Sequence, residues 1–96
     1  MPSTTFEQQL YQDVDELRRR SACPAEIVIT RWGEPDDVWV SWDVALMVDP
    51  ENMDSEAEQL YRDLGVLLNQ GPYRILEEGS DLDRIGYVVG SEAAQY

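Results

Sequence analysis

The segment of residues 37–49 places the strongest constraint on how this chain can fold. Apolar side chains occupy every second position in it: Val38, Val40, Trp42, Val44, Leu46 and Val48. Successive side chains of a β-strand point to opposite faces of a sheet, so this alternation predicts a long strand with one fully apolar face. Other elements must cover that face, and we therefore expect the strand to lie at the centre of the hydrophobic core.

Two amphipathic helices are predicted, one on each side of this strand in the sequence. Apolar side chains recur at helical spacing in residues 5–20, where Thr4 and Glu7 have the spacing of a capping box. The second helix begins at either Asp49 or Ser55, because both residues can cap it. It ends at the Gly-Pro pair that follows its last apolar residue.

Three further segments alternate in the same way and are predicted to be strands: residues 26–32, 73–77 and 83–89. Acid-rich turns at 33–37 and 78–81 join the strands in pairs. The predicted order is therefore helix, strand, strand, repeated once.

The two predicted helices also resemble each other in sequence. Residues 9–17 align with residues 59–67, and five of the nine positions are identical at a constant offset of fifty. Amphipathic helices can match by chance, but the matching order of elements favours an internal duplication. We expect a single domain, residues 1–96, with pseudo-repeats at 4–48 and 54–90 and a loose tail at 91–96.

A duplicated αββ unit predicts an α+β fold. The expected architecture is a two-layer sandwich, αββαββ, with a four-stranded antiparallel sheet and both helices on one face. The other face would carry four large apolar side chains: Trp32, Trp39, Met47 and Leu76. Exposed apolar patches commonly mark interfaces, so we expect this face or its edge to form a homodimer or to bind a partner. The alternative is that the C-terminal tail covers it.

The charge of the chain is extreme. Twenty Asp and Glu residues oppose seven basic residues, all of them Arg, and the formal net charge is −13. Such a surface repels nucleic acid and anionic membranes and attracts basic surfaces. There is no transmembrane run and no signal peptide, so the expected location is the cytoplasm, or the host cytoplasm if the protein is phage-encoded.

The sequence does not predict an enzyme. Histidine is absent, so the nucleophiles Ser21 and Cys23 lack their usual activating base, and a lone cysteine forms neither an internal disulfide nor a thiolate zinc site. No glycine-rich phosphate loop is present. Three acidic clusters could in principle hold Ca²⁺ or Mg²⁺, but they lack the EF-hand order and lie where turns and helix starts favour acids. We expect no catalytic residue, no cofactor and no metal.

The leading functional hypothesis is a binding inhibitor that imitates the charge of a nucleic-acid backbone and occupies a basic surface of a nucleic-acid-binding protein or complex. The chain is similar in size and charge to small acidic phage-encoded proteins, including many anti-CRISPR inhibitors. This resemblance is compositional and covers no motif. Partner contacts are predicted at eleven carboxylates: Glu7, Asp13, Asp15, Glu16, Glu34, Asp36, Asp37, Glu77, Glu78, Asp81 and Asp83.

The alternative hypothesis treats the charge as an adaptation to a salty cytoplasm. The chain would then be an ordinary dimeric or adaptor domain acting through the tryptophan-bearing sheet face. A third hypothesis is an antitoxin, immunity protein or secretion chaperone. Such a protein would, as in the first hypothesis, act by binding a partner. The distribution of carboxylates over the surface distinguishes mimicry from adaptation to salt. Mimicry needs carboxylates gathered on one surface, whereas adaptation spreads them evenly.

Overall fold

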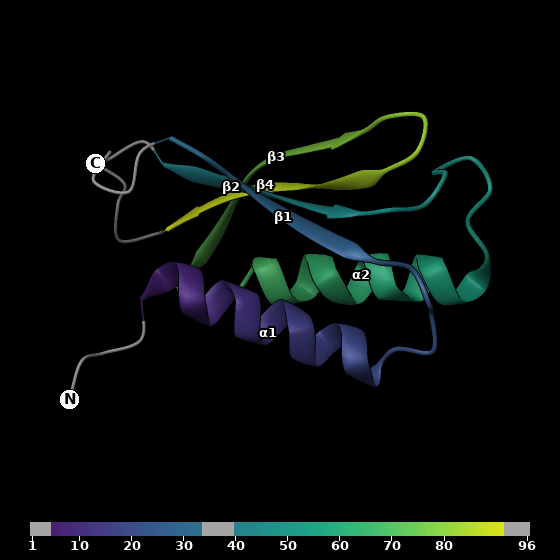
Figure 1. Cartoon of the computed structure of the whole chain (residues 1–96), viewed down its shortest axis with the longest axis horizontal. Helices are drawn as coiled ribbons and strands as arrows, with labels where there is room; N and C mark the ends of the chain where they lie inside the picture. The colour runs from purple at the N-terminus through teal and green to yellow at the C-terminus, as the bar shows by residue number, and fades with distance from the viewer. Residues whose placement is uncertain (1–4, 34–39, 92–96) are drawn as a thin grey trace.

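The chain folds as two helices and one four-stranded antiparallel sheet, which confirms the predicted α+β class. The computed structural model describes residues 5–33 and 40–91. The elements follow in the order α1 (Phe6–Arg20), β1 (Ile27–Trp32), β2 (Ser41–Leu46), α2 (Ser55–Leu68), β3 (Tyr73–Ser80) and β4 (Ile85–Ser91). The strand order is β1-β2-β4-β3. In Figure 1 the two helices run side by side below the strands, and their backbones approach each other closely.

The predicted central strand becomes β2, which lies in the interior of the sheet. It covers Ser41–Leu46 rather than the whole of 37–49, and residues 34–39 lie outside the described part of the chain. Its apolar face is fully used, because Trp42, Val44 and Leu46 are all buried. β1 pairs with β2 along its entire length, from Ile27 opposite Leu46 to Trp32 opposite Ser41.

The second hairpin is longer than the sequence predicts. Residues 78–80 continue β3 instead of forming a turn, and Ser91 belongs to β4 rather than to the tail. The pairing slips by one residue between Ile75 and Glu77, so a β-bulge interrupts the simple alternation that the prediction relied on. Residues 92–96 lie outside the described part of the chain.

The helix starts correct two details of the prediction. Thr5, not Thr4, caps α1: the Thr5 hydroxyl accepts from the Gln8 backbone N–H, and the Gln8 side chain accepts from the Thr5 backbone N–H, each at 3.1 Å. Thr4 lies outside the described residues. For α2 neither predicted cap, Asp49 or Ser55, is correct: Asp54 caps the helix by accepting from the Ala57 backbone N–H at 2.8 Å, and Ser55 is the first helical residue.

The hydrophobic core forms where the apolar stripes of both helices meet the apolar side chains of the strands. Seven of its side chains are less than 2% exposed: Leu10, Leu46, Leu60, Leu64, Leu68, Val44 and Val89. An aromatic cluster extends the core at the start of α1, where the Phe6 ring lies 4.6 Å from Trp42 and 5.3 Å from Tyr73. The Trp42 and Tyr73 rings therefore pack against the first turn of α1.

Two carboxylates of α1 satisfy polar groups at the edge of this core. The Trp42 indole N–H donates to a Glu7 carboxylate oxygen at 2.7 Å, and the Tyr73 hydroxyl donates to Asp13 at 2.6 Å. Trp42 and Tyr73 are each about 95% buried, so few water molecules could replace these acceptors. The two bonds fix α1 against β2 and β3.

A pair of tyrosines fixes α2 against the sheet. The rings of Tyr61 and Tyr87 stack with 4.9 Å between centroids, and the Tyr87 hydroxyl donates to the Tyr61 carbonyl at 3.4 Å. Gly65 leaves room for this contact, because a Cβ at that position would lie 2.6 Å from the Tyr87 hydroxyl oxygen. The glycine that weakens α2 as an isolated helix thus permits its packing on β4.

Replacing Glu7 by Ala should lower the free energy of unfolding by about 1–3 kcal/mol, because the buried Trp42 indole N–H loses its acceptor. Urea denaturation followed by tryptophan fluorescence measures the change. Glu16→Ala on the exposed side of the same helix is the matched control and should change stability by less than about 0.5 kcal/mol. Equal effects of the two substitutions would show that the Glu7–Trp42 bond does not stabilise the fold.

Alkaline pH should destabilise the protein through three tyrosines. Burial raises the pKa of Tyr61, Tyr73 and Tyr87 above the ordinary value of 10.0, and the Asp13 carboxylate raises that of Tyr73 further. The unfolded chain therefore loses phenolic protons near pH 10 while the folded chain keeps them, so the free energy of unfolding falls as pH rises beyond that point. Denaturation at a series of pH values checks this, and Tyr73→Phe should flatten the decline.

Candidate functional site

The four predicted partner-binding carboxylates of α1 do not form one exposed surface. Glu7 and Asp13 are only partly exposed and accept the hydrogen bonds from Trp42 and Tyr73 described above. Asp15 is exposed and forms an ion pair with Arg19 one turn later, and Glu16 is exposed. The inner pair thus holds the helix in place, whereas the outer pair is exposed to solvent.

The two acid-rich hairpins lead to opposite ends of the sheet. Glu34, Asp36 and Asp37 lie outside the described residues, but the strand ends that flank them, Trp32 and Ser41, are paired at one end of β2. The other end of β2 pairs with the start of β4, next to the turn that carries Asp81 and Asp83. Glu77, Glu78, Asp81 and Asp83 are all exposed along this second hairpin.

Carboxylates do gather at the end of the molecule where β2 finishes. The end of β2 lies between β1 and β4: Leu46 pairs with Ile85, and the Met47 backbone N–H donates to the Glu26 carbonyl at 2.9 Å. In Figure 1 the β3–β4 turn and the β2–α2 connection lie at the same end of the long axis. We call this surface the acidic end, and its exposed carboxylates are Glu26, Asp49, Glu51, Asp54, Glu56, Glu58, Asp81 and Asp83.

The acidic end is almost unopposed by positive charge from its own segments. Residues 26, 47–58 and 80–85 contain a single cation, Arg84, whose guanidinium lies 3.2 Å from the Asp43 carboxylate. The pKa of Asp49 is lowered, because the Asn52 side chain and the Glu51 backbone N–H donate to its carboxylate. Asp49 therefore stays ionised to a lower pH than an ordinary carboxyl.

Six of these eight carboxylates were not predicted to bind a partner. Five acids within residues 49–58 were visible in the sequence, but they read as helix and turn formers rather than as a surface. These acids lie near the β3–β4 turn only because β2 pairs with β4. The alternation within each strand does not reveal the order of the strands in the sheet. Within residues 5–33 and 40–91, no group of three or more acidic or sulfur side chains is arranged to hold a metal ion.

The predicted apolar patch on the sheet is divided. Trp32 is 57% exposed, Leu76 50% and Met47 37%. Trp32, on β1, pairs with the first residue of β2, and Met47 follows the last, so the two lie about 20 Å apart at the usual rise per residue. Leu76 lies on the far edge strand. The Asp43–Arg84 ion pair occupies the middle of this face. Trp39 lies outside the described residues.

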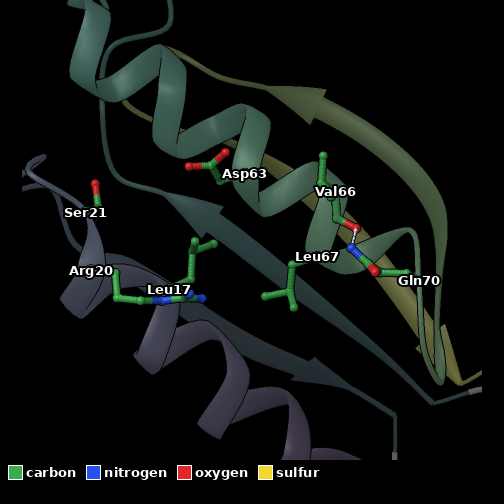
Figure 2. A pocket seen from close by; sticks show the side chains of 7 residues that line it. All are labelled: Leu17, Arg20, Ser21, Asp63, Val66, Leu67 and Gln70. Atoms are coloured by element: carbon green, nitrogen blue, oxygen red, sulfur yellow. Dashed lines mark hydrogen bonds between the residues drawn. The ribbon is translucent and has the colours of Figure 1, made fainter.

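A groove between the two helices is the other candidate ligand site. Figure 2 shows Leu17 of α1 and Leu67 of α2 on its two sides, with Arg20 beside Leu17 and Asp63 one helical turn before Leu67. The groove has a volume of about 400 Å³, and the Gln70 side chain donates to the Val66 carbonyl at its end. Its seven lining residues include one hydroxyl and no histidine or cysteine, so no activated nucleophile lines it.

None of the described helices is long and apolar enough to cross a membrane. Comparison of the chain with known protein families, with curated proteins and with solved structures finds no match in any of the three.

Proposed function

We propose that this chain is a small non-enzymatic binding protein whose acidic end occupies a basic surface of a nucleic-acid-binding protein or complex. The observation that carries the proposal is the gathering of eight exposed carboxylates, with one internally paired cation, at one end of the molecule. Carboxylates held on a rigid scaffold attract a basic channel over a long range, as a phosphate backbone does. An inhibitor of the anti-CRISPR or anti-defence type would act in this way, without a cofactor and inside the cell that holds its partner.

The distribution of the charge supports binding over a uniform adaptation to salt. The exposed acids of α1 are accompanied by Arg18, Arg19 and Arg20 in its last turn, where cations complement the helix dipole. The acidic end has no comparable set of cations in its own segments. Cations close to these segments along the chain include Arg20, six residues before Glu26, and Arg62, one turn after Glu58. The support for binding is therefore the concentration of acids within the segments of the acidic end.

We further infer that the scaffold is a duplicated αββ unit arranged as a two-layer sandwich with both helices on one face of the sheet. The strand order β1-β2-β4-β3 maps onto itself when the two hairpins are exchanged, as a pseudo-twofold requires. Each helix also contains the same internal side-chain hydrogen bond: Gln9 donates to Asp13 at 2.8 Å in α1, and Gln59 donates to Asp63 at 2.9 Å in α2. These matching bonds occur at the same offset of fifty residues as the sequence repeat.

The alternative function is that of a dimeric interaction domain of the haloadapted or antitoxin type. Its support is the exposure of Trp32, because tryptophan is enriched at protein interfaces. It is the weaker candidate for the sheet face as a whole, because the Asp43–Arg84 ion pair divides that face.

Neutralising two carboxylates of the acidic end should weaken partner binding by roughly 2- to 30-fold, because each exposed charge pair contributes about 0.2–1 kcal/mol. The variant is Glu51→Gln with Asp83→Asn, since neither side chain forms a hydrogen bond or ion pair described above. Partners would be captured from host lysate at low salt, eluted with a salt gradient and identified. Each captured protein would then be titrated in competition with labelled duplex DNA.

The matched control is Asp15→Asn with Glu16→Gln on α1, which removes the same charge from the same residue types. It should reduce the affinity clearly less than the first variant and leave the elution salt almost unchanged. Equal losses in the two variants would show that net charge, rather than the acidic end, determines binding. A partner that does not compete with duplex DNA would contradict the mimicry itself.

A further inference from the structure

We propose that β1 pairs antiparallel with β1 of a second copy of this chain, about a twofold axis at Thr30, to form a continuous eight-stranded sheet. This inference does not depend on the proposed function, because it rests on the backbone edge of β1 and not on the carboxylates of the acidic end. It rests on the contrast between the two edge strands, on the direction of the free backbone groups of β1, and on the positions of Val28 and Trp32.

The two edges of the sheet differ in their protection against pairing. β3 carries a bulge between Ile75 and Glu77 and two exposed carboxylates, Glu77 and Glu78. Bulges and charges are the features by which edge strands commonly avoid unwanted partners. β1 has no bulge, because its six residues pair with β2 without a register shift. Its one charged side chain, Arg31, pairs with Glu7 of α1 at 3.4 Å, and none of its residues is acidic in a chain with twenty acids.

The free backbone groups of β1 can be assigned from its pairing with β2. The Met47 N–H donates to the Glu26 carbonyl, so residue 26 and every second residue after it face β2. Residues 27, 29 and 31 therefore direct their N–H and C=O groups outward. The Tyr11 hydroxyl reaches the Ile29 carbonyl from α1 at 3.5 Å, which agrees with this assignment and is too long to satisfy the group well.

One register of self-pairing matches both the backbone and the side chains. With Thr30 opposite Thr30 of the second copy, Ile29 exchanges backbone hydrogen bonds with Arg31 of the other chain. The same register places Val28, 38% exposed, opposite Trp32 of the second copy. An aromatic ring thus covers a β-branched side chain across the strands, on both sides of the axis. Gly33 ends the pairing, because its φ of 101° is not an extended conformation.

The charge distribution favours a second copy in this orientation. Ile27 lies at the acidic end of the sheet, and Trp32 lies at the opposite end of the same strand. Antiparallel pairing therefore directs the two acidic ends away from each other. Repulsion between two chains of net charge −13 still opposes association, so added salt should strengthen this contact. Binding through the acidic end has the opposite dependence on salt, which separates the two proposals experimentally.

Sedimentation equilibrium should show a monomer at low salt and low concentration. The mass should approach twice the 11.0 kDa of one chain as protein rises to about 1 mM in about 1 M NaCl, because a strand-edge interface is small and weak. Trp32→Glu should weaken the association by about tenfold, by replacing both Val28–Trp32 contacts. Leu76→Glu, at a similarly exposed apolar residue on the other edge strand, is the matched control and should leave the association unchanged.

Cysteine cross-linking tests the register independently of the mass. Thr30→Cys should form a disulfide-linked dimer under mild oxidation, because non-hydrogen-bonded partners lie about 4.5 Å apart between Cα atoms. Val28→Cys should not, because its two copies would lie about 13 Å apart. The unmodified chain, whose Cys23 is buried, is the control for background oxidation.

A monomer at every salt and protein concentration would overturn the proposal. So would a dimer that Trp32→Glu leaves intact, or equal cross-linking through positions 28 and 30. None of these results would contradict the proposed function, because the competition assay with duplex DNA tests binding through the acidic end and not through β1.

Discussion

The pairing of β2 with β4 is the constraint on which the rest of this structure depends. It is the contact that joins the two helix–hairpin halves into one sheet, and it places Val44 opposite Tyr87 and Leu46 opposite Ile85. The core face of each hairpin thereby becomes part of one continuous surface. The same pairing leaves β1 and β3 as edges and brings the β3–β4 turn beside the end of β2, so both the acidic end and the free edge of β1 follow from it.

The distribution of polar bonds shows how so acidic a chain keeps a stable core. Glu7 and Asp13 turn inward from α1 and accept hydrogen bonds from Trp42 and Tyr73, so two carboxylates serve the packing of the helix. Charge-assisted hydrogen bonds of this kind are stronger than bonds between neutral groups. The exposed acids lie mainly beyond the core on turns and helix starts, where their mutual repulsion is screened by solvent.

The sequence predicts the elements of this fold better than their arrangement. Alternation in 37–49 indicated a buried strand, and the periodicity of residues 5–20 indicated α1 almost to the residue. Such patterns depend on which side chains face the core, and that information is local. The bulge near Ile75 was missed because it changes the pairing of β3 without changing the composition of the strand.

Site residues were harder to predict, because a site is defined by contacts between distant segments. Glu7 looked like an exposed helical acid, and only its contact with Trp42, thirty-five residues later, shows its structural role. The carboxylates of residues 49–58 were visible in the sequence, but nothing local revealed that they adjoin Asp81 and Asp83. The single tryptophan patch that was expected is divided for the same reason, since Asp43 and Arg84 meet only after folding.

The two candidate surfaces are compatible because the β1 contact uses backbone groups along the edge of the sheet and leaves the carboxylates of the acidic end exposed. A pair of chains joined through β1 would keep both acidic ends exposed and directed away from each other. Two weak charge-dominated contacts on one particle can together exceed the affinity of either, provided that the partner presents basic surfaces at a matching separation. A partner with a single basic channel would gain nothing from the second copy. Dimerisation would therefore select for extended or repeated basic partners, and the twofold axis at Thr30 would set the spacing that they must match.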